Sequence, residues 1–154
     1  MKKRAQELAL KRLGRSEISA SEMERYLRRK EIDAAIAQEV VADFVGRGHI
    51  SDERYAAMVA RSQLGRGKGP GVVRRKLAQK GVRLDRAGLK ELVHGVDGFD
   101  EHAAALQVLE RRYPQAGTDQ KAAARAFQGL VRRGFSFEVA RAALQKMRHH
   151  SVGK

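Results

Sequence analysis

The phrase "YLRRKEID", Tyr26–Asp33, decides how this chain is divided, because it returns as "KLAQKGVRLD" (Lys76–Asp85) and as "LVRRGFS" (Leu130–Ser136). Each copy has a leucine, two further residues, a basic residue, a turn residue, and then Ile, Val or Phe. The leucines, 50 and 53 residues apart, are Leu27, Leu77 and Leu130. A period of this size predicts tandem supersecondary units.

The helices on either side of this phrase carry the same apolar positions in each copy. Four residues before the leucines, one helical turn away on the same face, stand Met23, Val73 and Ala126. A residue suited to capping a helix follows each turn: Asp33, Asp85 and Ser136. Seven, eight and eleven residues beyond the caps, an apolar stripe recurs: Val40, Val41 and Phe44; Leu92, Val93 and Val96; Ala143, Leu144 and Met147. The stripe predicts a further helix with one buried face in every copy.

Another amphipathic stretch precedes each copy, so the sequence predicts three helices per repeat. The expected fold class is all-α, with three tandem three-helix repeats in an elongated, modular arrangement. We place the repeats at residues 5–48, 51–97 and 99–148, followed by a polar C-terminal tail at 149–154. A compact nine-helix domain with coincidental spacing is the alternative.

Two local features of the repeats give sharper expectations. Ser21 and Glu24 have the spacing of a capping box at the start of a second helix. Gly81 and Gly134 suit a left-handed turn at the end of the second helix. Glu31 occupies the same position in the first repeat, which argues against a left-handed turn there.

Composition also favours a helical protein without covalent cross-links. The chain of 154 residues is 42% hydrophobic and 5% aromatic, and it is rich in helix-forming Ala, Leu, Arg, Lys, Glu and Gln. It has no cysteine, which excludes disulfides and thiolate chemistry. No apolar run approaches the ~20 residues that cross a bilayer, and the basic start of the chain lacks the features of a secretory signal. We therefore expect a cytoplasmic protein with no membrane partner.

Positive charge is concentrated in the middle of the chain. The net charge is +14, from 32 basic and 18 acidic residues. Ten basic residues and a single acid, Asp85, lie between Arg61 and Lys90. Such an imbalance predicts a polyanionic partner, which is either nucleic acid or an acidic protein surface.

The glycine-rich stretch "LGRGKGPGVVRRKL", Leu64–Leu77, begins inside this basic segment. It is not a nucleotide-binding P-loop, because Gly69 stands where Ser or Thr would follow Lys68. Its glycines also alternate too strictly for a dinucleotide-binding motif. We expect a flexible connector between two helices, followed by a helix that buries Val73 and Leu77 and exposes its arginines.

No catalytic or metal-ligating constellation is visible in the sequence. The five histidines form no H-E-x-x-H motif, and no G-x-S-x-G nucleophile elbow occurs. We therefore expect no enzyme activity, no metal and no cofactor, and a nucleotide- or metal-dependent enzyme has the least support. Three short helices with a glycine-bearing turn also resemble a helix-turn-helix unit. A standalone nucleic-acid-binding protein therefore remains an alternative.

Several short motifs occur along the chain in a distinctive order and spacing. They are Asp52 with Arg54, Tyr55 and Ala56; the Gly69–Pro70 step; Leu77 and Gly81; and the run Arg133, Gly134, Phe135 and Ser136. Together they resemble the RecX family of bacterial regulatory proteins, which bind and modulate the RecA recombinase. The resemblance covers about residues 6–147 and implies three tandem three-helix repeats.

The resemblance implies a regulator that binds RecA and its filament on single-stranded DNA. The implied outcome is inhibition of RecA ATPase, strand exchange and co-protease activity. We further expect contacts with single- and double-stranded DNA, and a monomeric protein. The residues expected to contact RecA or DNA are Arg61, Arg66, Lys68, Arg74, Arg75, Lys76, Lys80, Arg132 and Arg133.

Overall fold

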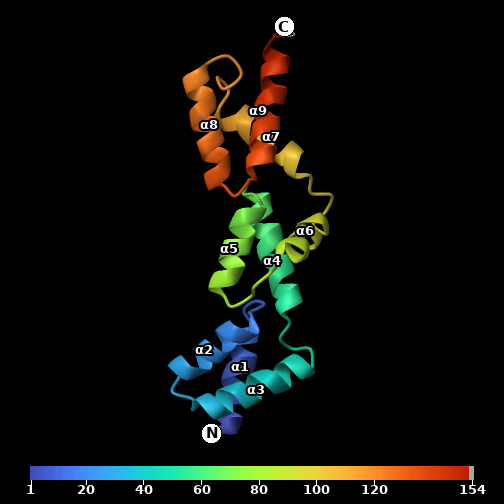
Figure 1. Ribbon diagram of the computed structural model, residues 1–154. Coiled ribbons are helices and arrows are strands. Elements are labelled where there is room, and N and C mark those ends of the chain that lie inside the picture. The colour runs from blue at the N-terminus through green and yellow to red at the C-terminus, as the bar shows by residue number, and fades with distance from the viewer. Residues whose placement is uncertain (153–154) are drawn as a thin grey trace. The chain divides into compact units, whose positions relative to one another are not determined.

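The computed structural model describes residues 1–152, and all of its regular structure over these residues is helical (Figure 1). The helices are α1 (Lys2–Leu13), α2 (Ala20–Arg29), α3 (Ala34–Gly46), α4 (Asp52–Gly65), α5 (Pro70–Gln79), α6 (Arg86–His94), α7 (Glu101–Arg112), α8 (Gln120–Arg132) and α9 (Phe137–Val152). The prediction of an all-α chain is therefore confirmed. Helix α9 continues through His149 and His150, which the sequence places in a tail.

The chain packs into two compact units whose division does not follow the sequence repeats. The N-terminal unit comprises Met1–Val59 and Lys76–Arg83, and the C-terminal unit comprises Ala60–Arg75 and the chain from Leu84 onward. The division therefore passes through α4 and α5. Residues 51–59 and 76–83 of the middle repeat belong to the N-terminal unit, and the rest of that repeat belongs to the C-terminal unit.

The recurring phrase of the sequence is the C-terminal end of the second helix in each repeat. In all three copies the apolar residue after the turn donates its backbone N–H to the leucine carbonyl: Ile32 to Leu27 at 3.1 Å, Val82 to Leu77 at 2.9 Å, and Phe135 to Leu130 at 3.1 Å. This is the Schellman arrangement, which satisfies carbonyls left open at a helix end. The three leucines are fully buried, as predicted.

A left-handed residue sits at the same place in each of these three turns. Gly81 has φ 79° and Gly134 has φ 97°, as the sequence leads one to expect. Glu31 also has a positive φ, 66°, so the expectation drawn from its side chain was wrong. Left-handed backbone costs a non-glycine residue about 1–2 kcal/mol. In Glu31 the Schellman hydrogen bonds offset that cost, and the side chain is exposed.

The core of the N-terminal unit uses the predicted apolar positions. Helix α2 packs on α3, and α1 packs on both. The described core includes Met23 and Leu27 of α2, together with Val40, Val41 and Phe44 of α3. The prediction for the first repeat is therefore confirmed at every position of its stripe.

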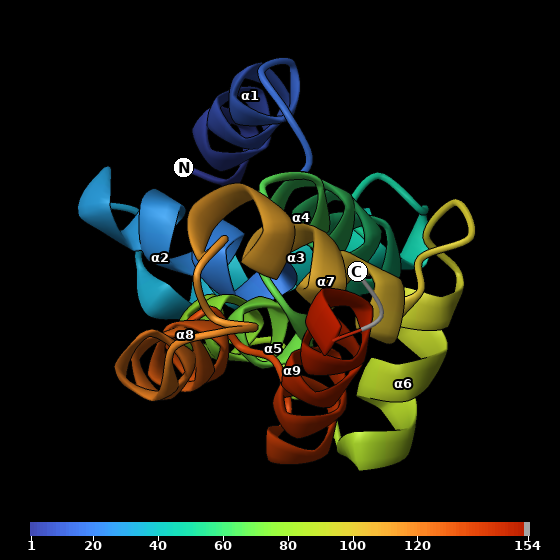
Figure 2. The same ribbon diagram turned by 90° about the horizontal axis from the view of Figure 1, so that it is seen from above.

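The C-terminal unit is built around α9, which packs against α7 and lies beside α8 in both views (Figures 1 and 2). Ala126 and Leu130 of α8 meet Ala143 and Leu144 of α9 in its core. The middle repeat follows the prediction less closely, because its third helix, α6, has only nine residues. Val93 is buried there, whereas Leu92 and Val96 are half-buried.

The helix caps are as predicted at the third helices but not at α2. Asp33 accepts a hydrogen bond from the N–H of Ala35, and Asp85 accepts one from Gly88. The hydroxyl of Ser136 accepts from the N–H of Val139. At α2 the capping residue is Ser19, whose hydroxyl accepts from the Glu22 N–H, so the predicted Ser21–Glu24 box was wrong by two residues.

Candidate functional site

The predicted basic residues lie on α4 and α5, on the chain next to α5, and at the end of α8. Arg61 lies on α4, Arg66 and Lys68 lie on the connector to α5, and Arg74–Lys76 lie on α5 itself. Lys80 follows α5, and Arg132 and Arg133 end α8. Lys68 and Arg133 are half-buried, and the other seven are exposed. Lys76 and Lys80 belong to the N-terminal unit, and the remaining seven belong to the C-terminal unit.

In the C-terminal unit the connector before α5 is bonded to the turn that ends α8. The backbone N–H of Gly69 donates to the Arg133 carbonyl at 2.7 Å, and that of Gly71 donates to the Gly134 carbonyl at 2.8 Å. The Arg75 guanidinium donates to the Arg132 carbonyl at 3.4 Å. We call these contacts the second junction.

Close backbone approach explains Gly69 of the connector and Gly134 of the turn. A Cβ on Gly69 would lie 2.6 Å from the Gly134 carbonyl carbon, and a Cβ on Gly134 would lie 2.5 Å from the Val72 nitrogen. Neither distance is compatible with a side chain. The expected flexible connector is thus replaced by a fixed one, because its glycines permit packing within the protein.

In the N-terminal unit the turn that ends α5 is bonded to the start of α2 in the same way. The Ser19 hydroxyl donates to the Lys80 carbonyl at 2.6 Å, and Ser19 is fully buried. The Arg25 guanidinium donates to the Gln79 carbonyl at 3.3 Å. A Cβ on Gly81 would collide with the Ser21 side chain. We call these contacts the first junction.

The two junctions use equivalent positions of successive repeats. Ser19 and Gly69 both stand eight residues before the repeat leucine, and Arg25 and Arg75 both stand two residues before it. Their acceptors, two and three residues after the next leucine, are the carbonyls of Gln79 and Lys80 in the first junction, and of Arg132 and Arg133 in the second. In each junction, donors of one repeat therefore bond to carbonyls of the Schellman turn of the following repeat.

The contacts of the predicted basic residues divide them into three groups. Arg75 and Arg133 donate to backbone carbonyls, the latter to Gly67 at 3.5 Å, so both take part in packing. Arg61 and Lys80 lie near carboxylates, 3.9 Å from Asp97 and 3.8 Å from Glu22. Over residues 1–152, no ion pair engages the other five: Arg66, Lys68, Arg74, Lys76 and Arg132.

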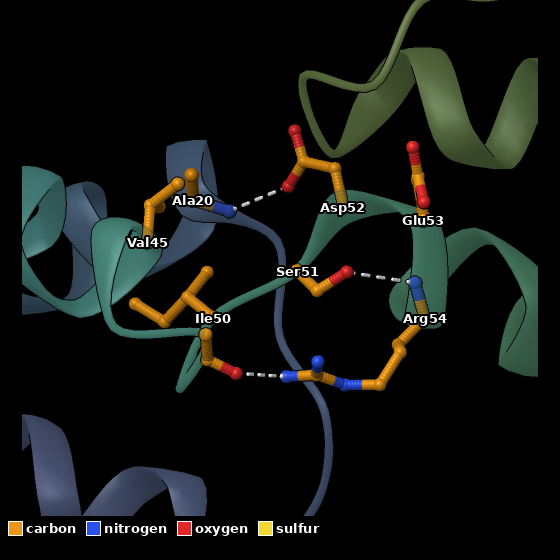
Figure 3. Close-up of a pocket in the computed structure, with 8 residues that line it drawn as sticks. Ala20, Val45, Ile50, Ser51, Asp52, Glu53 and Arg54 are labelled. Atoms are coloured by element: carbon orange, nitrogen blue, oxygen red, sulfur yellow. Dashed lines mark hydrogen bonds between the residues drawn. The ribbon is translucent and has the colours of Figure 1, made fainter.

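A separate hollow of about 400 Å³ lies where α3 leads into α4 (Figure 3). The polar groups at its rim are bonded within the protein. Asp52 accepts from the Ala20 N–H at 2.9 Å, and the Arg54 guanidinium donates to the Gly48 carbonyl at 2.7 Å (Figure 3). These bonds join the start of α4 to the first repeat. The polar groups around the hollow therefore contribute to packing within the N-terminal unit.

Two side chains of the N-terminal unit, Tyr55 and Lys2, have a shifted pKa. Burial raises the pKa of the Tyr55 phenol, the Glu22 carboxylate adds to the rise, and the Arg12 guanidinium opposes it. A hydrogen bond and charge attraction from Glu39 raise the pKa of exposed Lys2. Within residues 1–152 no group of His, Asp and Glu is arranged to hold a metal ion. None of the helices described is both long and apolar enough to span a membrane.

Three successive parts of the chain match the three domains of one protein family. Residues 5–44 match the first three-helix domain of RecX, residues 51–84 match the second, and residues 100–144 match the third. The chain belongs to the RecX family. The resemblance drawn from the motifs is thereby confirmed, as is the series of three three-helix domains.

Individual RecX proteins show how far the similarity extends. The regulatory protein RecX of Chromohalobacter salexigens is 34% identical over 139 residues, which cover 88% of each chain. That of Streptococcus pneumoniae serotype 19F is 28% identical over 141 residues, 91% of this chain and 54% of the relative. This RecX chain thus spans about half the length of some curated relatives that it matches. The crystal structure of RecX from Lactobacillus salivarius shares the fold, with a TM-score of 0.81 and 20% identity over 96% of both chains.

Proposed function

We propose that this RecX chain regulates RecA by binding RecA and its filament on single-stranded DNA, and that it inhibits RecA ATPase, strand exchange and co-protease activity. Family membership carries the proposal, because the matched relatives are named regulatory protein RecX. The net charge of +14 supports a partner that is polyanionic, as DNA and an acidic protein surface are.

Five cations are proposed to make the principal contacts: Arg66, Lys68, Arg74, Lys76 and Arg132. Because no carboxylate pairs with them in the described chain, their charge is available to phosphates or to acidic side chains. Contacts of this kind weaken steeply as salt rises, since binding releases counterions. Arg75 and Arg133 add positive charge to the C-terminal unit while they hold the second junction.

The deciding experiment adds the chain to preformed RecA filaments on single-stranded DNA and follows ATP hydrolysis. We expect hydrolysis to fall as the chain is titrated in, with strand exchange and co-protease activity falling in parallel. If saturating chain leaves all three activities unchanged, the RecA proposal is wrong.

The charge distribution supports a second candidate, a standalone nucleic-acid-binding protein. The same titration separates the two candidates when DNA binding is measured without RecA. Tight binding to free DNA, together with no effect on the filament, would favour the second candidate.

A charge-reversal pair tests whether the proposed cations bind the polyanion. Arg74→Glu with Lys76→Glu should weaken filament or DNA binding, and the slope of log K against log salt should become shallower by about one for each phosphate that is no longer bound. Arg28→Glu with Arg29→Glu, two exposed changes at the end of α2, is the matched control. Equal effects of the two pairs would show that only net charge matters.

A further inference from the structure

The start of α9 carries an exposed aromatic ring. The Phe137 side chain is 62% exposed, and the other large apolar side chains found exposed in the described chain are the aliphatic Met1, Leu10 and Val45. An isolated exposed aliphatic residue is normal on a protein surface. Among these exposed side chains, the Phe137 phenyl ring is the aromatic one.

The Phe137 ring is held in place by a second aromatic side chain. The Phe127 ring of α8 is stacked on it, with 5.8 Å between ring centroids and 9° between the ring planes. Phe127 is half-buried and packs against the core of the C-terminal unit. Phe137 is therefore oriented by stacking on a ring that is itself anchored, while most of its surface remains open to solvent.

A hollow of about 390 Å³ adjoins this ring. Its lining contains the cation of Arg86, the hydroxyl-bearing Ser136, the carboxylate of Glu138 and the apolar side chains Val131, Phe135 and Phe137. The carboxylate of Glu101 is also near, because it accepts a hydrogen bond from the Ser136 N–H at 3.2 Å. The lining of the hollow thus combines the exposed Phe137 ring with charged side chains of both signs.

The helices that carry the ring have a strong positive balance. Residues 120–152, which contain α8 and α9, include seven Lys or Arg and one acid, Glu138. A polyanionic ligand is favoured by this charge. A protein partner that docks by apolar burial would need a broader apolar patch than a single phenyl ring provides.

We infer that Phe137 is a stacking platform for a base of single-stranded nucleic acid, with Arg86 positioned for an adjacent phosphate. Aromatic side chains bind unpaired bases in this way, and basic residues hold the backbone beside them. The inference rests on the DNA contact in the proposed function and names a residue that makes it. It lies outside the nine basic residues assigned from the sequence.

Three substitutions at Phe137 separate stacking from apolar contact. Fluorescence anisotropy with a labelled single-stranded oligonucleotide should show about 5- to 100-fold weaker binding for Phe137→Ala and Phe137→Leu, because both lack an aromatic face. Phe137→Tyr should bind within about twofold of the natural protein, since it keeps the ring. Leu10→Ala, an exposed apolar change in the N-terminal unit, is the control and should leave affinity unchanged.

An abasic oligonucleotide of the same length gives the second arm. It retains the phosphates but offers no base, so natural protein and Phe137→Leu should bind it equally. A 2-aminopurine base in the ordinary strand should be quenched by the natural protein and not by Phe137→Leu. Equal binding of the ordinary strand by both proteins would overturn the inference while leaving DNA binding intact. Failure of the natural protein to bind any strand would instead contradict the DNA contact in the proposed function. Weakened RecA binding by Phe137→Leu with unchanged DNA binding would assign the ring to a protein contact.

Discussion

The two junctions occupy the same positions in the repeats but are made of different chemical groups. In the first, the buried Ser19 hydroxyl bonds the incoming turn, and the turn glycine faces the Ser21 side chain. In the second, the N–H groups of Gly69 and Gly71 bond the turn, and the turn glycine faces backbone. The Lys80 carbonyl of the first junction and the Arg133 carbonyl of the second occupy equivalent positions as acceptors. The difference shows that the repeat preserves the position of the bond, whereas the donor can be a side chain or the main chain.

The largest expected effect comes from Gly134→Ala in the second junction. The new Cβ would collide with the Val72 nitrogen, and the alanine would have to adopt a φ of 97°. We therefore expect the unfolding free energy to fall by about 3 kcal/mol or more. Gly98→Ala in the same unit is the matched control, because Gly98 has φ 69° and no atom within 4 Å of an added Cβ. It should cost about 1 kcal/mol. Urea denaturation followed by circular dichroism measures both, and equal destabilisation would show that the close approach does not matter.

A second substitution should relieve the collision caused by an added Cβ in the first junction, but not the collision in the second. Gly81→Ala collides with the Ser21 side chain, and Ser21→Gly removes the obstructing atoms. In a double-mutant cycle the pair should therefore show a favourable coupling of about 1 kcal/mol or more. The same Ser21→Gly change should leave the destabilisation by Gly134→Ala unaltered, because that collision is with main-chain atoms. Strict additivity of Gly81→Ala and Ser21→Gly would contradict the packing described.

Ser19→Ala tests whether the first junction depends on one hydroxyl. The change removes both the cap of α2 and the bond to the Lys80 carbonyl in a fully buried place, so the unfolding free energy should fall by about 2 kcal/mol. Asp33→Ala removes only a cap at an exposed site and should cost about 1 kcal/mol. Denaturant titration of the two variants is the measurement. If Ser19→Ala lowered the unfolding free energy less than Asp33→Ala does, the hydroxyl would not be needed for the junction.

The smallest expected effect concerns the ionisation of Tyr55 in the N-terminal unit. Burial, helped by Glu22, raises the pKa of Tyr55, and Glu22 also lies near Lys80 in the first junction. A raised tyrosine pKa adds stability that is fully present below the ordinary value of about 10 and is lost as pH rises through the folded value. In a pH titration followed by phenolate absorbance, Tyr55 should therefore ionise at a higher pH than an ordinary tyrosine. Glu22→Gln should lower the pKa of Tyr55. Tyr55→Phe identifies the signal, and no change with Glu22→Gln would refute the coupling.

The period of the sequence was sufficient to predict the buried leucines, their partners one turn earlier, and the caps of the third helices. These features are local, since a helix end and its turn are determined by residues within a few positions of one another. Leu27, Leu77 and Leu130 are each fully buried for this reason. The short α6 departs from the pattern because only Val93 of its stripe is buried.

The junctions could not be predicted from the sequence, because they join residues more than 50 positions apart. Ser19 and Gly69 have no chemical similarity as side chains, and they become equivalent only through the carbonyl that each one reaches. Arg75 looked like one more member of a basic surface. Its equivalence to Arg25, visible in the spacing to the leucines, was the available signal that it has a packing role as well.

The boundary between the two units passes through α4 and α5, and this limits which segments of the chain can be exchanged with those of a relative. The stretch that sequence periodicity marks as one module contributes to two packed bodies. Transplanting that module from a relative would replace part of each body at once, so the incoming segment must suit two sets of neighbours. Cuts after Val59, Arg75 and Arg83 instead follow the packing, and together they leave the residues of each body with their own packing partners.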